Sequence, residues 1–225
     1  MTALRRHLLG SGLVLLASIS SATAYDEREL QKLQNSGSCQ GCDLRNAVLP
    51  EASFPAANLR NARLRDADLK GVDLKGGDLK GADFRRANLE RANLSGSNLA
   101  EAYFAGADLE KANLSEANLS GTDSRAADLE KADLRNVNFK GADLRGSLMK
   151  RAALAGADLS GANLEDALMH RAILNGANLR TARKLERGQL ATACGDDQTQ
   201  LPGGFSVKPC PPGLGGQKPD AGPDS

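Results

Sequence analysis

Apolar residues recur at every fifth position through most of this chain. From Leu44 to Leu179 the spacing gives 28 sites, and 27 of them carry Leu, Phe or Met, with Ser124 as the exception. Ala lies two residues before 21 of these sites, and Asp or Asn stands between the two in 20 cases. No insertion interrupts the register, which predicts one tandem-repeat domain over residues 44–182.

A period of five fits neither an α-helix nor a β-strand. Five helical residues advance about 140° beyond a full turn, so the leucines would spiral over every face of the helix. In a strand, an odd step would place successive leucines on opposite faces. The chain must therefore bend once in every repeat to return Leu and Ala to one interior, and stacked coils must pair their backbones. The pattern predicts an all-β solenoid.

The tandem motif A-[DN]-L-x-x, as in A-D-L at 67–69 and A-N-L at 92–94, resembles the pentapeptide-repeat family. The resemblance implies a right-handed quadrilateral β-helix in which four repeats form one coil, so that 28 repeats make about seven coils. Leu and Ala would point inward, and Asp or Asn would support the turn by accepting hydrogen bonds from nearby backbone N–H groups. Ser124 would leave a small cavity unless Phe104 fills the space.

Residues 1–24 are typical of a secretory signal peptide. Arg5 and Arg6 precede a short apolar run at 8–19, and the sequence A-T-A at 22–24 matches a cleavage site. The alternative, a transmembrane anchor, needs about 20 consecutive apolar residues, and this run is shorter. The sequence therefore predicts export to the periplasm, with the thylakoid lumen or the extracellular space as alternatives, and no stable membrane insertion.

All four cysteines lie after the predicted cleavage site, two before the repeats and two after them. An oxidising destination favours two disulfides. The placement favours Cys39 with Cys42 and Cys194 with Cys210, among the three connectivities that four cysteines allow. Cys39 and Cys42 both fall on inward positions of the extrapolated register, so an inert pair of buried thiols is the alternative.

The N-terminal flank of the repeats, residues 25–43, is predicted to be a cap. A stacked solenoid has an open apolar end, which invites end-to-end association unless something covers it. This flank combines the C-x-x-C motif with a short helix expected over 26–34, where Leu30 and Leu33 share one face.

The C-terminal flank, residues 183–210, is predicted to be a second cap. It combines a short helix expected over 184–194 with the loop that a Cys194–Cys210 disulfide would close. Residues 211–225 hold too few apolar side chains to fold and are expected to be disordered.

Four apolar residues, Leu148, Ala153, Leu168 and Ile173, occupy outward positions that elsewhere carry Asp or Asn. On a four-sided solenoid, Leu148 lies one coil from Leu168 and Ala153 one coil from Ile173, so the four would form one patch near the C-terminal end. Such a patch is typical of an interface with a partner or with a second copy of the chain. The alternative is that the C-terminal flank folds back and covers it with Leu185, Leu190, Leu201 or Phe205.

The sequence contains no recognisable arrangement for catalysis, metal binding or a cofactor. After residue 24 the one histidine is His170, at an outward position, so Ser-His-Asp, Cys-His and His-rich metal arrangements cannot be assembled. The glycines follow the period of five, and the turn explains the repeated Asp. The sequence predicts a protein that is not an enzyme and that needs no cofactor.

Lys and Arg number 29 against 28 Asp and Glu, and this balance excludes a strongly basic nucleic-acid binder. The family resemblance raises an alternative, in which an acidic rod imitates DNA and interacts with gyrase. The outward charges of the four walls that begin at Leu44, Leu49, Phe54 and Leu59 sum to 0, 0, −1 and +1. No acidic stripe imitates a row of phosphates, and no nucleic-acid partner is expected.

The predicted function is therefore a non-enzymatic exported scaffold, or a protein–protein interaction module, for a partner that the regular outward positions do not identify. A second alternative is a redox or stress accessory of the cell envelope that uses Cys39 and Cys42 as an exchangeable dithiol. That alternative requires a pair that solvent can reach.

Overall fold

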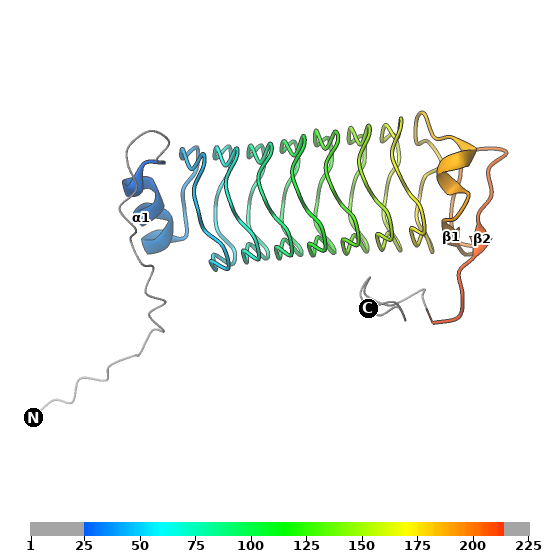
Figure 1. Ribbon diagram of the computed structural model, residues 1–225, viewed down its shortest axis with the longest axis horizontal. Helices are drawn as coiled ribbons and strands as arrows, with labels where there is room; N and C mark the ends of the chain where they lie inside the picture. The colour runs from blue at the N-terminus through cyan, green and yellow to red at the C-terminus, as the bar shows by residue number, and fades with distance from the viewer. Residues whose placement is uncertain (1–24, 214–225) are drawn as a thin grey trace, which may run out of the picture.

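The protein forms a straight rod of stacked coils (Figure 1), seen in a computed structural model that describes residues 25–213. From Asp43 with Arg63 to Asn163 with Arg183, parallel backbone bridges join the outward residue just before each inward residue to the residue twenty positions later. Twenty residues equal four repeats, so each coil contains four. The predicted signal peptide and residues 214–225 of the predicted tail lie outside the described residues.

The interior of the rod consists of the period-five residues and the alanines two positions before them. From residue 57 to 179 the inward Leu, Phe, Met and Ala side chains are at most 1% exposed. Burying one leucine in this way contributes on the order of 1.5–3 kcal/mol. Backbone hydrogen bonds connect the coils, for example from the Leu69 N–H to the Asn88 carbonyl at 2.7 Å. Repeated burial and this ladder together hold the coils in register.

The Asp or Asn of each repeat accepts a hydrogen bond from the backbone N–H two residues later, and this holds at all 20 such positions. At Asp108 the bond from the Glu110 N–H measures 2.9 Å. The next residue takes the left-handed conformation, with φ 66° at Gly71 and 59° at Lys111. Glycine adopts this conformation without steric cost, which explains its recurrence there. The predicted role of Asp and Asn in the turn is confirmed.

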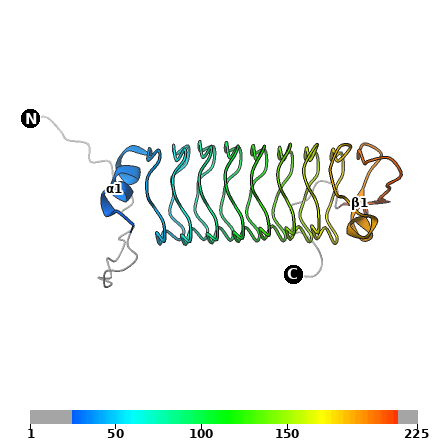
Figure 2. The same ribbon diagram turned by 90° about the horizontal axis from the view of Figure 1, so that it is seen from above.

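Helix α1, Glu27–Ser36, lies across the N-terminal end of the rod (Figures 1 and 2). The Asp26 side chain accepts a hydrogen bond from the Arg28 N–H and begins the helix, and Gly37, at φ 64°, ends it. Leu33 is buried against the interior, and Leu30 is partly buried there. The helix expected over 26–34 is therefore present, with slightly different bounds.

At the C-terminal end the expected helix over 184–194 is wrong in extent. The structure has a 3-10 helix, η1 Arg187–Leu190, followed by strand β1, Cys194–Gly195, which pairs in parallel with β2, Lys208–Pro209. Cys194 bridges to Ile173 and Gln200 to Asn178. The backbone leaves the helix early because it continues the ladder of the solenoid, with one and then two extra residues in the register.

Among residues 25–213, no helix has the length and apolar character needed to span a membrane.

Candidate binding faces and disulfide-bonded ends

One wall of the rod carries a row of ion pairs, and we call it the arginine face. Its outward residues come from the repeats whose inward residues are Leu44, Leu64, Phe84, Phe104, Ser124, Leu144 and Leu164. In four of these coils Asp and Arg stand two positions apart and pair through two or more hydrogen bonds: Asp43 with Arg45, Asp83 with Arg85, Asp123 with Arg125, and Asp143 with Arg145. The same turn that needs Asp thus positions a cation beside it.

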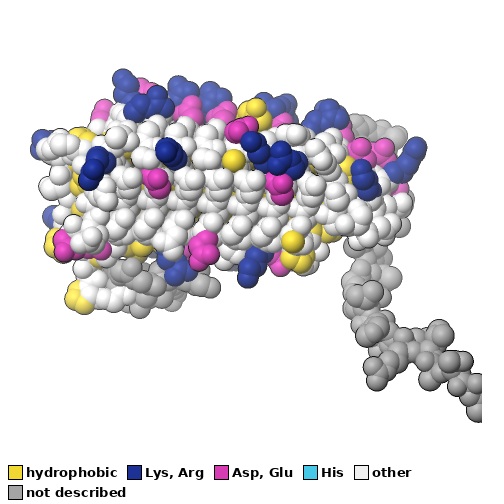
Figure 3. Space-filling model, turned by 180° about the vertical axis from the view of Figure 1, so that it is seen from behind, with side chains coloured by type: hydrophobic (Ala, Val, Ile, Leu, Met, Phe, Trp, Pro, Cys, Tyr) yellow, Lys and Arg dark blue, Asp and Glu magenta, His cyan; other side chains and the backbone are white. Residues whose placement is uncertain are grey.

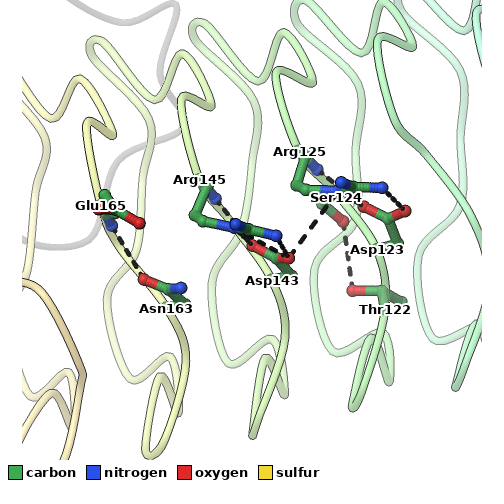
Figure 4. Close-up of polar contacts among 8 residues, drawn as sticks. All are labelled: Thr122, Asp123, Ser124, Arg125, Asp143, Arg145, Asn163 and Glu165. Atoms are coloured by element: carbon green, nitrogen blue, oxygen red, sulfur yellow. Dashed lines mark hydrogen bonds and ion pairs between the residues drawn. The ribbon is translucent and has the colours of Figure 1, made fainter.

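Figure 4 shows two of these pairs in successive coils. The Arg125 Nε and Nη2 atoms lie 2.7 and 2.8 Å from the two carboxylate oxygens of Asp123, and Arg125 Nε is 3.8 Å from Asp143 in the next coil. Because the side chains project in parallel from a rigid ladder, the row is ordered along the rod axis. Paired guanidinium and carboxylate groups of this kind have fixed geometry.

The carboxylates of the arginine face are held in the charged form. Hydrogen bonds from Arg125 lower the pKa of Asp123, and hydrogen bonds from Arg145 lower the pKa of Asp143. The paired cations neutralise this charge locally. The face therefore presents alternating charges rather than an anionic stripe.

Tyr103 interrupts the row at its centre, in a repeat position that elsewhere carries Asp or Asn. Its side chain is 46% exposed, and the Arg85 guanidinium lies 5.6 Å from the ring centroid. Ala105 stands where neighbouring coils have Arg, so the ring has a small side chain beside it. Tyr103 was not among the sequence-predicted site residues. The sequence feature that could have indicated it is an aromatic residue at an outward position, in a chain with only 3% aromatic residues.

Elsewhere the outer surface is mixed in charge. Lys70 pairs with Glu90 one coil away at 2.5 Å, and Lys111 pairs with Glu110 at 3.0 Å. On the side drawn in Figure 3, Lys and Arg are interspersed with Asp and Glu, and hydrophobic side chains appear only in small separate places. A continuous acidic surface is not seen on this side.

The structure brings both predicted cysteine pairs together as disulfides. Cys39 and Cys42 are joined close to the N-terminal end, with exposures of 0% and 3%. Cys194 and Cys210 are joined across β1 and β2. The first pair is thus enclosed in the interior, where an external thiol has no approach without movement of the fold.

The C-terminal segment, residues 184–213, hydrogen-bonds the last coil through side chains. Asp196 Oδ1 accepts from the Gly176 N–H at 2.8 Å, and the Thr199 hydroxyl lies 2.9 Å from the Leu174 carbonyl. The Gln189 amide donates to the carbonyls of Leu164 and Ala167, and the Thr192 hydroxyl accepts from the Arg171 N–H. These polar groups stand where the backbone of another coil would be.

A pocket of about 460 Å³ lies beside this segment. Its lining consists of Asn175, Gly195, Asp196, Asp197, Val207, Pro209 and Cys210. Burial would raise the pKa of Asp196, but hydrogen bonds from the Gly176 N–H, the Thr199 hydroxyl and other neighbours outweigh it and lower that pKa. Asp196 is therefore an ionised structural group.

The predicted apolar patch does not form one exposed surface. Ala153 is 1% exposed and Ile173 is 9% exposed, whereas Leu148 and Leu168 are half-buried. The methyl group of Ala153 is short and lies in the ladder between Asp133 and Ile173, which shield it. Ile173 is in turn bridged to Cys194, so the ladder continues over it. The first alternative, an exposed patch, is therefore wrong for Ala153 and Ile173, whereas the second, a cover from the C-terminal flank, holds at Ile173 through Cys194.

His170 is exposed at its outward position, as the register predicts. Among residues 25–213 no three His, Cys, Asp or Glu side chains are grouped so that they could hold a metal ion.

Comparison with known proteins identifies the repeats. The family model described as "Pentapeptide repeats" matches residues 38–76, 77–115, 112–151 and 147–183, which is more than half of the chain. The chain belongs to the pentapeptide-repeat family. The comparison with curated protein sequences found no match.

Among solved structures, a trypsin-treated variant of QnrB1, described as a plasmid-mediated fluoroquinolone resistance protein, superposes with a TM-score of 0.61. It is 21% identical, and the match covers 71% of this chain and 80% of QnrB1. HetL, described as a pentapeptide repeat protein involved in heterocyst differentiation regulation from the cyanobacterium Nostoc sp. strain PCC 7120, is 26% identical over 80% of this chain and 91% of its own, with a TM-score of 0.42. The fold shared with QnrB1 is the right-handed β-helix solenoid.

Proposed function

We propose that this protein is an exported, non-enzymatic scaffold that binds a protein partner through the arginine face, with Tyr103 at the centre of the contact. The observation that carries the proposal is the position of Tyr103. It is a large, exposed aromatic side chain in a row made mostly of paired charges.

Tyrosine and arginine are the residue types most enriched where protein interfaces hold their binding energy. Tyr103 lies beside Arg85, and the coil on its other side carries the Asp123–Arg125 pair. The flanking pairs are already ordered by the ladder, so a partner would lose little side-chain entropy on binding them. A flat, ordered wall with one aromatic anchor suits a folded protein surface better than a small molecule.

In this proposal the scaffold consists of about seven coils, with α1 over part of the N-terminal end and the C-terminal segment over the other end. The signal-like sequence at 1–24 and the two disulfides support export to an oxidising compartment. The periplasm is the proposed location.

Two observations weigh against the alternatives. The locally neutralised charges of the arginine face do not resemble the phosphates of DNA, which disfavours a DNA-mimic interaction with gyrase. The enclosure of Cys39 and Cys42 disfavours an exchangeable dithiol, because thiol exchange requires access to the sulfur atom.

Site-specific photocrosslinking tests the proposed face. A benzophenone amino acid replaces Tyr103 in the protein produced in its own host, and the matched control places the same group at Asn113, an outward position on the opposite wall. We expect one discrete adduct from position 103 and none from position 113. Equal adducts from both positions, or none from either, would contradict the proposal.

Export is tested separately by the intact mass of the protein isolated from its host. We expect a chain that begins at Tyr25 and gains the mass of four hydrogens on reduction. A full-length chain with four free thiols would contradict export and reopen the gyrase alternative.

A further inference from the structure

The first coil is incompletely covered at the N-terminal end of the rod. Leu49, Ala52 and Phe54 occupy inward positions, yet Leu49 is 9% exposed and the other two are half-buried. The adjacent Val48 is 62% exposed, more than any other large hydrophobic side chain among residues 25–213. We call residues 48–56 the open edge.

Helix α1 explains why only part of this end is covered. Glu29 of α1 accepts a hydrogen bond from the Asp43 N–H, and Leu33 packs on the interior near the first disulfide. Figure 2 shows that α1 spans only part of the width of the end. Among residues 25–213, no hydrogen bond joins α1 to residues 48–56.

The open edge presents unpaired backbone groups of both kinds. In the next coil the N–H of Asp68 donates to Ala47 and its carbonyl accepts from Leu49. The equivalent N–H groups of Val48 and Ser53 have no hydrogen bond to any residue between 25 and 213. The carbonyls of Val48, Pro50, Ser53 and Pro55 have none either within that range. This is a sheet edge ready to pair with another strand.

The edge also lacks the charges that usually protect such edges from pairing. Its one ionisable residue is Glu51, whose carboxylate lies over Gly71 in the next coil rather than at the end of the rod. Protected edges carry lysine, inward-pointing charges or proline. This edge has no lysine. Pro50 and Pro55 remove no donor from it, because the equivalent N–H groups of Lys70 and Lys75 donate to the Asp68 and Asp73 side chains within their own coil.

We propose that the open edge pairs with the open edge of a second copy of this chain, forming an N-terminal to N-terminal dimer. An uncharged edge that holds both donors and acceptors is complementary to itself when it is turned by a twofold rotation. Donors of Val48 and Ser53 in one copy then face carbonyls of the other, and the half-exposed Phe54 side chains are removed from water. The two α1 helices lie outside the contact, each beside the partner's first coil.

The test measures, by light scattering, the molar mass of the protein as isolated from its host. We expect twice the monomer mass, and loss of the dimer in Val48→Asp, which places a charge on the edge without disturbing the interior. Tyr103→Asp is the matched control, because Tyr103 is the other exposed large hydrophobic residue among residues 25–213, and we expect this variant to remain dimeric. Leu148→Asp, near the opposite end, is expected to remain dimeric as well.

A double variant, Val48→Cys with Ser53→Cys, provides a second readout that does not depend on destabilising the contact. A twofold rotation that pairs residues 48–56 with themselves places Val48 of one copy near Ser53 of the other. We expect the double variant to form a disulfide-linked dimer under mild oxidation, and Tyr103→Cys to form none. A wild-type monomer at every concentration up to the solubility limit would overturn the proposal. A dimer that survives Val48→Asp, or that Leu148→Asp or Tyr103→Asp dissociates instead, would overturn it equally.

Discussion

The two ends of this rod are finished by different means. At the C-terminal end the ladder itself continues through Cys194 and Gln200, and side chains of the C-terminal segment bond the remaining groups of the last coil. At the N-terminal end a helix covers one half of the first coil, and the other half remains an open edge. A repeat sequence cannot terminate itself, since each coil exposes the same groups as the last. The segments that flank the repeats therefore decide whether an end is closed or available for contact.

The largest expected difference between the ends concerns their disulfides. Replacing Cys194 and Cys210 with Ala opens a loop of 16 residues and should lower the free energy of unfolding by about 3 kcal/mol. Replacing Cys39 and Cys42 with Ala opens a loop of only 3 residues, and the same relation gives about 1.5 kcal/mol. Urea unfolding of the two double variants measures both losses in the free energy of unfolding. A larger loss for the variant without Cys39 and Cys42 would contradict the prediction.

The next largest loss in the free energy of unfolding should come from removing the side chains that complete the C-terminal end. Asp196→Ala leaves the Gly176 N–H without its acceptor and should cost about 1–2 kcal/mol. Its counterpart at the other end, Glu29→Ala, removes one bond to the Asp43 N–H next to an edge that is already open, and should cost about 1 kcal/mol or less. Thermal unfolding of both variants measures the difference. Equal losses would mean that the C-terminal segment closes its end no better than α1 does.

A change in the middle of the rod should alter the free energy of unfolding of the whole protein without favouring either end. Ser124 is buried, with Phe104 and Leu144 one coil away on either side, and its hydroxyl donates to Thr122 at 3.2 Å. Ser124→Leu restores the repeat and should raise the free energy of unfolding by about 1 kcal/mol, because it adds a buried apolar side chain to the stack between Phe104 and Leu144. A loss of stability there would show that the neighbouring side chains have already closed the space. Ser124→Ala, which adds no volume, is the control.

The smallest expected effect is a pH dependence of the stability that Asp196 contributes at the C-terminal end. The pKa of Asp196 is lowered in the folded protein, so its contribution is present above the pKa of the unfolded chain and is lost as the pH falls through the folded value. Acidification below about pH 4 should therefore reduce the effect of Asp196→Ala. Melting curves of the variant and the wild type should converge in acid, and a constant separation would contradict this role.

Much of the fold can be predicted directly from the sequence. The period of five identifies the inward residues, and the Asp and Asn positions predict the turn bonds that the structure shows. The placement of the cysteines on either side of the repeats is enough to predict which of them lie close together. The inward positions and the turn bonds depend on local chemistry that is repeated many times, so one repeat predicts the others.

The ends could not be predicted in the same way. Asp196 and Thr199 act because their side chains reach backbone groups 20 and 25 residues earlier, after the register has shifted. Spacing alone does not reveal such a shift. The burial of Ile173 depends on the same shifted register. Tyr103 and Val48 were visible as departures from the repeat, but their exposure depends on which neighbours the coil places beside them.

Native-state hydrogen exchange tests the difference between the ends most directly. We predict that, in dilute solution, the amides of Leu49 and Phe54 in the first coil exchange much faster than those of Leu174 and Leu179 in the last, although all four donate to carbonyls at 2.7–2.8 Å. Protection at Leu174 and Leu179 should equal that of the central coils. Equal exchange at both ends, or faster exchange at the C-terminal end, would contradict this difference.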